Sequence, residues 1–215
     1  MSSPVKIRVD KPPLRWWFVL LWIIANLAIP LLALFIFTIS GGAITELIIP
    51  ASSATAEASG YAGLAGLSIA FIVTLPITAL IAGVVQWLVL RWHVPWARRW
   101  LVATAIGVML GILAGLSVGR GPLGWGILGA LIGLAQWFVI RRVLPDAYWW
   151  IVVSIVGMVL GEQLTPNRLA FSGVVVRGLP QLVIQLLGPI LIWAILSGIT
   201  LWALSQRAHA SEGAP

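Results

Sequence analysis

The sequence predicts an all-α integral membrane protein with six transmembrane helices, in which two helical hairpins form a tandem parallel repeat. The first observation behind this prediction is composition. Of the 215 residues, 60% are hydrophobic and 9% are charged, against about 45–50% and about 25% in soluble domains. The second is a series of long uncharged windows, and the third is a recurrence of residues at an offset of 50 positions.

The composition excludes whole classes of protein. With 13 basic and 6 acidic side chains, a soluble enzyme of this length could not cover its surface, and disorder is excluded because it requires low hydrophobicity. The chain has no cysteine, which excludes disulfides, thiolate metal sites and cysteine nucleophiles. A multi-span membrane protein remains.

The windows between charges give the spans. A bilayer core requires about 20 apolar residues in a helix. Five windows meet this length, and the sixth, between Asp146 and Glu162, encloses 15 residues and spans the core if Glu162 lies at the far interface. No window alternates polar and apolar residues as a barrel strand would. The first apolar run is too long for a cleaved signal peptide. The predicted helices are Trp16–Ile39, Leu64–Leu90, Trp100–Gly119, Leu123–Ile140, Trp149–Leu164 and Leu182–Leu204.

The basic residues orient these spans. Six spans place both termini on one side, and that side carries ten of the 13 basic residues, leaving Arg120, Arg168 and Arg177 on the other. By the positive-inside rule, both termini are expected to be cytoplasmic. The membrane domain covers 16–206, between a cytoplasmic N-terminal segment 1–15 and a cytoplasmic tail 207–215.

An internal repeat is the most informative feature of the sequence. Ala79–Gly111 aligns with Gly129–Gly161 without a gap and with 12 identities in 33 positions. The predicted repeat units cover about 64–119 and 123–164, and each is a hairpin of two spans. Because such a hairpin returns to its starting side, the two copies are expected to be parallel, related by an axis along the membrane normal.

Side chains near the inner boundary recur in both units. We expect the tryptophans and arginines to anchor the helix ends in the headgroup region. Gln86 and Gln136 lie just inside the boundary, and we expect each to make one interhelical hydrogen bond, with a ligand or permeation role as the alternative. The predicted anchors are Trp87, Arg91, Trp100, Trp137, Arg141 and Trp150.

Glycines recur every four residues in the third to fifth spans. Small residues at this spacing let helix backbones approach closely, so tight packing is expected. The alternative is that the grooves they leave receive a lipid or pigment tail; no other cofactor and no metal is predicted. The packing glycines are Gly107, Gly111, Gly115, Gly119, Gly129, Gly133, Gly157 and Gly161.

The recurring hairpin, Gly-x-x-Gln-Trp-x-x-Leu/Ile-Arg, resembles a motif repeated in many uncharacterised bacterial multi-pass membrane proteins. The resemblance covers Ala79–Gly111 and Gly129–Gly161. It implies a membrane-embedded helical hairpin in a bacterial cytoplasmic (inner) membrane, and it implies no activity and no catalytic residue. The first and last spans lack the motif, so we expect them to flank the repeats.

Chemistry-bearing clusters are missing from the sequence. No Ser-His-Asp set, no paired carboxylates within a span and no metal-ligand cluster can be assembled, so the protein is not expected to be an enzyme. Glu162 is expected to pair with Arg120, Arg168 or Arg177, with a cation or proton site as the alternative. Gln181 and Gln185 share one helix face and are expected to be packing residues.

Two functions therefore compete. The preferred one is a non-enzymatic packing or accessory subunit of a larger membrane complex, such as a bioenergetic one, whose partners are the lipid bilayer and other membrane proteins. The alternative is a small transporter or channel with a path between the two hairpins, near Gln86, Gln136, Glu162 and Gln185. Nucleic acid is not an expected partner because the basic residues are spread over short loops.

Overall fold

The computed structural model describes residues 14–48, 56–94, 97–119, 121–144, 146–165, 170–171, 174–175 and 179–212. Within these ranges the chain is helical apart from turns and two antiparallel strands of two residues each, paired Ala170 to Val175 and Phe171 to Val174. The elements are α1 (Trp17–Ile48), α2 (Ala56–Leu90), α3 (Ala97–Val118), α4 (Pro122–Ile140), α5 (Trp149–Leu164), β1 (Ala170–Phe171), β2 (Val174–Val175) and α6 (Leu179–Glu212).

The helices agree with the predicted spans in number and order. Among the described residues, five helices are long and apolar enough to cross a membrane, and α5, with 16 residues, is shorter. The helix α5 has the predicted bounds, whereas α1, α2 and α6 extend beyond the predicted spans to 32, 35 and 34 residues. The predicted cytoplasmic tail 207–215 therefore begins inside α6.

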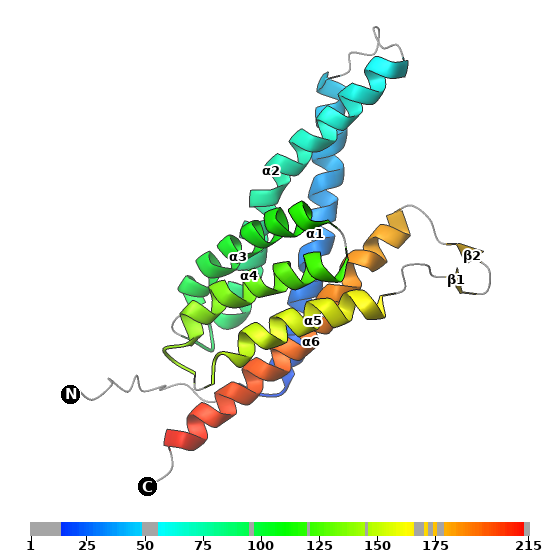
Figure 1. Cartoon of the computed structure of the whole chain (residues 1–215). Coiled ribbons are helices and arrows are strands. Elements are labelled where there is room, and N and C mark those ends of the chain that lie inside the picture. The colour runs from blue at the N-terminus through cyan, green and yellow to red at the C-terminus, as the bar shows by residue number, and fades with distance from the viewer. Residues whose placement is uncertain are drawn as a thin grey trace.

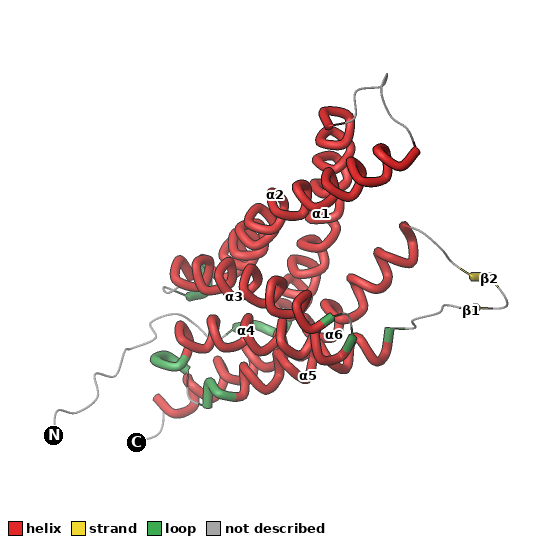
Figure 2. Tube along the Cα trace, turned by 45° about the horizontal axis from the view of Figure 1, so that its top comes forward, coloured by secondary structure: helices red, strands yellow, loops and turns green. Residues whose placement is uncertain are grey.

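The six helices form a closed ring. Each helix packs against the next one in chain order, and α6 packs back against α1. The start of α1, the end of α6 and the connections α2–α3 and α4–α5 lie at one end of the bundle (Figure 1). The turned view shows α1 and α2 extending together beyond the other helices at the opposite end (Figure 2).

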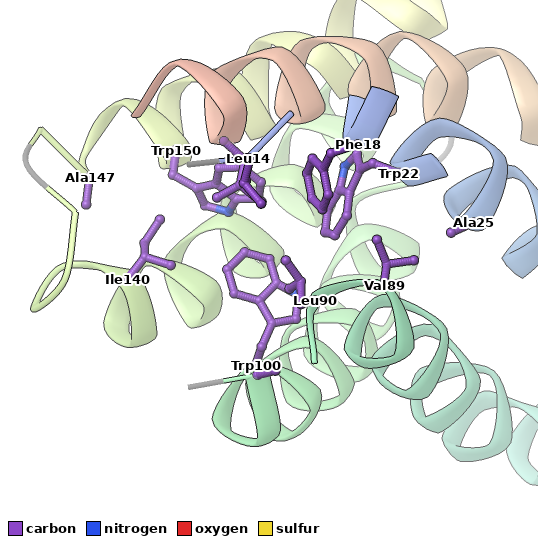
Figure 3. Close-up of a cluster of buried hydrophobic side chains, with 12 residues drawn as sticks. Leu14, Phe18, Trp22, Ala25, Val89, Leu90, Trp100, Ile140, Ala147 and Trp150 are labelled. Carbon is purple, nitrogen blue, oxygen red and sulfur yellow. The ribbon is translucent and has the colours of Figure 1, made fainter. Parts of the chain in front are cut away.

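Two layers of buried side chains fill the ring. We call the layer nearer the start of α1 the tryptophan layer, because Trp22, Trp100 and Trp150 lie at its centre together with Phe18 and Leu90 (Figure 3). The second layer lies further along the helices and contains Ala79, Ala82, Val108, Ile132, Met158 and Trp193.

Most of the predicted packing glycines lie against a neighbouring backbone. A Cβ atom at Gly107 would lie 2.9 Å from the Cα of Ile132, and one at Gly157 would lie 2.8 Å from the Cα of Trp193. Gly119 is a correction. It follows the end of α3, has a φ of +98° and has no atom within 4 Å of a Cβ position, so it forms the α3–α4 turn, where a left-handed backbone favours glycine.

Candidate functional site

Three indole rings meet at the centre of the ring of helices. Trp22 of α1, Trp100 of α3 and Trp150 of α5 are all fully buried. Their ring centroids are 5.3 Å apart for Trp100 and Trp150, 6.1 Å for Trp22 and Trp100, and 6.4 Å for Trp22 and Trp150, and all three pairs are edge-to-face. This is a favourable geometry for aromatic pairs, and it joins three helices that are not neighbours in the chain.

Gln86 of α2 connects the indoles to the polar side chains around them. Its Oε1 accepts hydrogen bonds from Trp100 Nε1 at 2.8 Å, Thr104 Oγ1 at 3.0 Å and Gln136 Nε2 at 3.0 Å. Its own Nε2 donates to Asn26 Oδ1 at 2.6 Å. The expected interhelical hydrogen bond is present, but it is one of several, because this amide joins α2 to α1, α3 and α4.

Gln136 of α4 repeats this arrangement 50 residues later. Its Oε1 accepts a hydrogen bond from Trp150 Nε1 at 2.9 Å, as Gln86 does from Trp100. Its Nε2 donates to Thr104 Oγ1 at 2.8 Å. In both cases the glutamine binds the tryptophan of the following helix and the small polar residue of the preceding one.

The buried positions of Trp100 and Trp150 correct the sequence analysis. An interfacial anchor presents its ring to the headgroups, whereas these two rings are fully enclosed by protein. Trp87 and Trp137 are half-buried, and the guanidinium carbons of Arg91 and Arg141 lie 5.4 Å and 4.9 Å from their respective ring centroids. The anchor role of these four residues stays a prediction.

A third set of contacts of the same kind joins α6 to α1. Trp22 Nε1 donates to Ser197 Oγ at 3.0 Å, and a Cβ atom at Gly198 would lie 3.0 Å from the Trp22 ring. Asn26, one turn after Trp22, is fully buried as Thr104 is one turn after Trp100. The repeat at an offset of 50 residues does not indicate this set, and from it the first and last spans are expected only to flank the repeats.

The register of this third set follows from shared glycine and tryptophan positions. The pattern Gly-x-x-Gln-Trp of α2 and α4 corresponds to Gly198-x-x-Leu201-Trp202 in α6, with leucine in the glutamine position. Leu201 is buried like the two glutamines. The corresponding return-helix pairs are Trp100 and Thr104, Trp150 and Ser154, and Trp22 and Asn26.

One buried hydroxyl of the ring lacks the partner that its counterparts have. Asn26 accepts a hydrogen bond from Gln86, and Thr104 accepts one from Gln136. The next acceptor in this order is Ser154, and the residue in the glutamine position of the next helix is Leu201. Among the described residues, Ser154 Oγ is buried without a hydrogen-bond partner, and Leu201 has no group that could donate one.

The other candidates lie away from this network. Glu162 is half-buried on α5, and its expected partners Arg120, Arg168 and Arg177 are outside the described residues, as are the side chains of Gln181 and Gln185. An exposed ion pair joins Arg207 to Asp146 at 3.7 Å. No group of His, Cys, Asp and Glu suited to a metal ion occurs in the part of the chain that the structure describes.

The network consists entirely of neutral side chains, so its chemistry is hydrogen bonding and packing rather than proton transfer. No family model matches the chain, and neither a curated protein nor a solved structure resembles it significantly. The functional argument therefore depends on the geometry of the network itself.

Proposed function

We propose that the protein is a non-enzymatic packing or accessory subunit of a larger complex in a bacterial cytoplasmic membrane. The observation that carries this proposal is the content of the ring: the polar side chains at its centre bind one another across helices, and the indoles fill the remaining space. Groups arranged in this way hold helices together, and the four hydrogen-bonding partners of Gln86 are engaged within the protein rather than available to a solute.

A membrane-spanning arrangement of all six helices is part of the proposal. The 16 residues of α5 rise about 24 Å, which is less than a membrane core of about 30 Å. We propose that α5 still crosses, with the residues at its two ends reaching the interfaces. The helix ends that lie together at one end of the bundle (Figure 1) carry Arg91 after α2, Arg99 in the first turn of α3, Arg142 after α4 and Arg207 near the end of α6. This distribution supports a cytoplasmic location for both termini.

The tandem repeat is also proposed. The hairpins α2–α3 and α4–α5 have the same glutamine–tryptophan contact at an offset of 50 residues, and α3 and α5 have the same pattern of buried and exposed side chains over 101–110 and 151–160. Both observations support two parallel copies of one hairpin.

A transport path between the hairpins, the alternative function, has less support. A path needs polar groups distributed along the membrane normal. The hydrogen-bonded residues instead come from one helical turn of α1 and of α3, Trp22–Asn26 and Trp100–Thr104, which is about 6 Å of helix. The six residues that form the second layer, further along the helices, are apolar apart from the indole nitrogen of Trp193.

The outer surface supports a partner in the membrane. Large apolar side chains such as Ile24, Phe35, Ile72, Val102 and Phe138 are exposed on the described helices, so lipid or other helices must cover them. Subunits of a respiratory or other bioenergetic complex are the proposed partners, and a lipid or pigment is the proposed small-molecule companion.

Purification of the tagged protein from its native membrane in mild detergent tests the accessory role. Mass spectrometry should find other membrane proteins in fixed stoichiometry, and an absorbance spectrum would reveal a pigment. A parallel purification of an unrelated tagged membrane protein is the control. Recovery of the protein without partners, together with solute flux when it is reconstituted alone in vesicles, would overturn the proposal in favour of transport.

A further inference from the structure

A groove of about 220 Å³ runs along the outside of the seam between α5 and α6. Its wall is largely apolar, and the hydroxyl of Thr200, which also lines it, is already bonded to the carbonyl of Leu196 at 2.8 Å. The lining residues are Trp149, Val153, Ile199, Thr200, Ala203, Leu204 and Arg207.

The three sets of corresponding contacts, α2 with α3, α4 with α5 and α6 with α1, explain why the surface is hollowed at this seam. The residue after the shared tryptophan is Leu88 in α2, Phe138 in α4 and Ala203 in α6. Leu88 and Phe138 are large and exposed on the bundle surface. Alanine at the same position of α6 contributes a single methyl group, so the surface beside α5 is hollowed where the other two helices carry a large side chain.

The two ends of the groove differ in chemistry. Val153 and Ile199 line its apolar part, whereas Trp149 and Arg207 lie toward the end of the bundle that carries the α4–α5 connection. A tryptophan and an arginine at the boundary of an apolar groove suit the headgroup region of a bilayer. The side chain of Arg207 is 65% exposed, and its guanidinium has five donors, so its single long contact with Asp146 leaves donors for a phosphate.

We infer that this groove binds one acyl chain of an anionic phospholipid, whose phosphate is held by Arg207 at the cytoplasmic boundary. The inference uses the membrane placement proposed above but not the accessory role. A segment of a single hydrocarbon chain is narrow enough for this groove, whereas a partner helix, about 10 Å across, does not enter it. Arg207, whose contact with Asp146 is long and exposed and therefore weak, selects an anionic lipid over a zwitterionic one.

Native mass spectrometry of the full chain released from nanodiscs of phosphatidylglycerol and phosphatidylcholine tests this site. Wild type should retain one phosphatidylglycerol. Ala203→Phe, which restores the residue found at Phe138, should abolish that retention by filling the groove. Leu88→Phe adds the same side chain on α2, outside the groove, and should retain lipid as wild type does.

Arg207→Gln separates headgroup recognition from the fit of the acyl chain and does not depend on how well Ala203→Phe folds. Its preference for phosphatidylglycerol over phosphatidylcholine should fall about fivefold, the change expected for one surface arginine. Equal retention and equal preference in wild type, Ala203→Phe and Arg207→Gln would overturn the inference. Failure of the chain to enter nanodiscs at all would instead contradict the membrane placement.

Discussion

At Gln86 a single carbonyl oxygen accepts hydrogen bonds from two other helices, and the amide nitrogen donates to a third. In a membrane, apolar burial contributes little to helix association, so packing and hydrogen bonds of this kind have a larger share. The residue type and its position near the helix end are visible in the sequence. The number of partners is not, because Asn26 and Thr104 become neighbours of Gln86 only when the ring closes.

Replacing Gln86 by leucine tests this connectivity. The change keeps a similar volume but removes the hydrogen bond to Asn26 Oδ1 and the three that Gln86 Oε1 accepts. A buried group left without a partner, as Asn26 Oδ1 would be, costs about 1–3 kcal/mol. We expect Gln86→Leu to lower the free energy of unfolding in detergent by about 2 kcal/mol or more. Thr38→Val is the control, since that hydroxyl is exposed and bonds within its own helix; equal stability of the two variants would contradict the network.

Two positions related by the 50-residue offset should respond differently to loss of their hydroxyl groups. Thr104 Oγ1 bonds both glutamines, so Thr104→Val should destabilise the protein by about 1 kcal/mol. Ser154 Oγ has no partner among the described residues, so Ser154→Ala should change stability by less than about 0.5 kcal/mol. Denaturant unfolding followed by tryptophan fluorescence measures both, and a larger loss at Ser154 would refute the assignment.

Leu201→Gln should complete the hydrogen-bond pattern. A glutamine in α6 would be placed to donate to Ser154 Oγ, as Gln136 donates to Thr104. A membrane hydrogen bond stabilises by about 0.6 kcal/mol on average, so a small rise in stability is expected. In a double-mutant cycle, the gain should disappear when Ser154→Ala is added. A gain that survives in the double variant would come from another contact.

At the scale of the helices, close backbone approach depends on particular glycines. A Cβ at Gly111 would lie 2.6 Å from Leu128 Cδ1 and 3.2 Å from the Leu128 Cα, so α3 and α4 have no space for a side chain there. The four-residue spacing predicts such contacts from sequence. It does not predict where a helix ends, and for that reason Gly119 was assigned to packing although it forms a turn.

Gly111→Leu tests the α3–α4 contact. Overpacking of this kind costs about 1–3 kcal/mol, so the yield of folded protein and its thermal stability should fall. Gly126→Ala is the matched control on α4, because its new methyl group would meet a side-chain methyl of Val159 at 3.2 Å and helical alanine is favoured over glycine. Equal losses in both variants would indicate general sensitivity of the bundle rather than a specific contact.

At the scale of the whole molecule, the all-α class, the order of six helices and the recurrence of the glutamine and tryptophan positions were predictable from sequence. The burial of Trp100 and Trp150, which were expected at the interface, and the closure of α6 on α1 were not. In the two repeated hairpins the tryptophan helix follows the glutamine helix at a fixed spacing. In the third set the corresponding helix, α1, precedes α6 by more than a hundred residues, so it does not share that spacing. In addition, Leu201 replaces the glutamine that identifies the other two sets, so the remaining similarity is carried by Gly198, Trp202 and Trp22.

Labelling of a cysteine at the centre of the ring tests most directly whether the interior is packed. The chain has no native cysteine, and Ser154→Cys changes one atom at a fully buried position. In native membranes it should not react with a membrane-impermeant thiol reagent from either side, but should react after denaturation. Control cysteines at the exposed residues Ser117 and Arg142 should react from the outer and the cytoplasmic side, respectively. Reaction of Ser154→Cys at a rate near that of the controls would mean a water-filled path and would contradict a packed core.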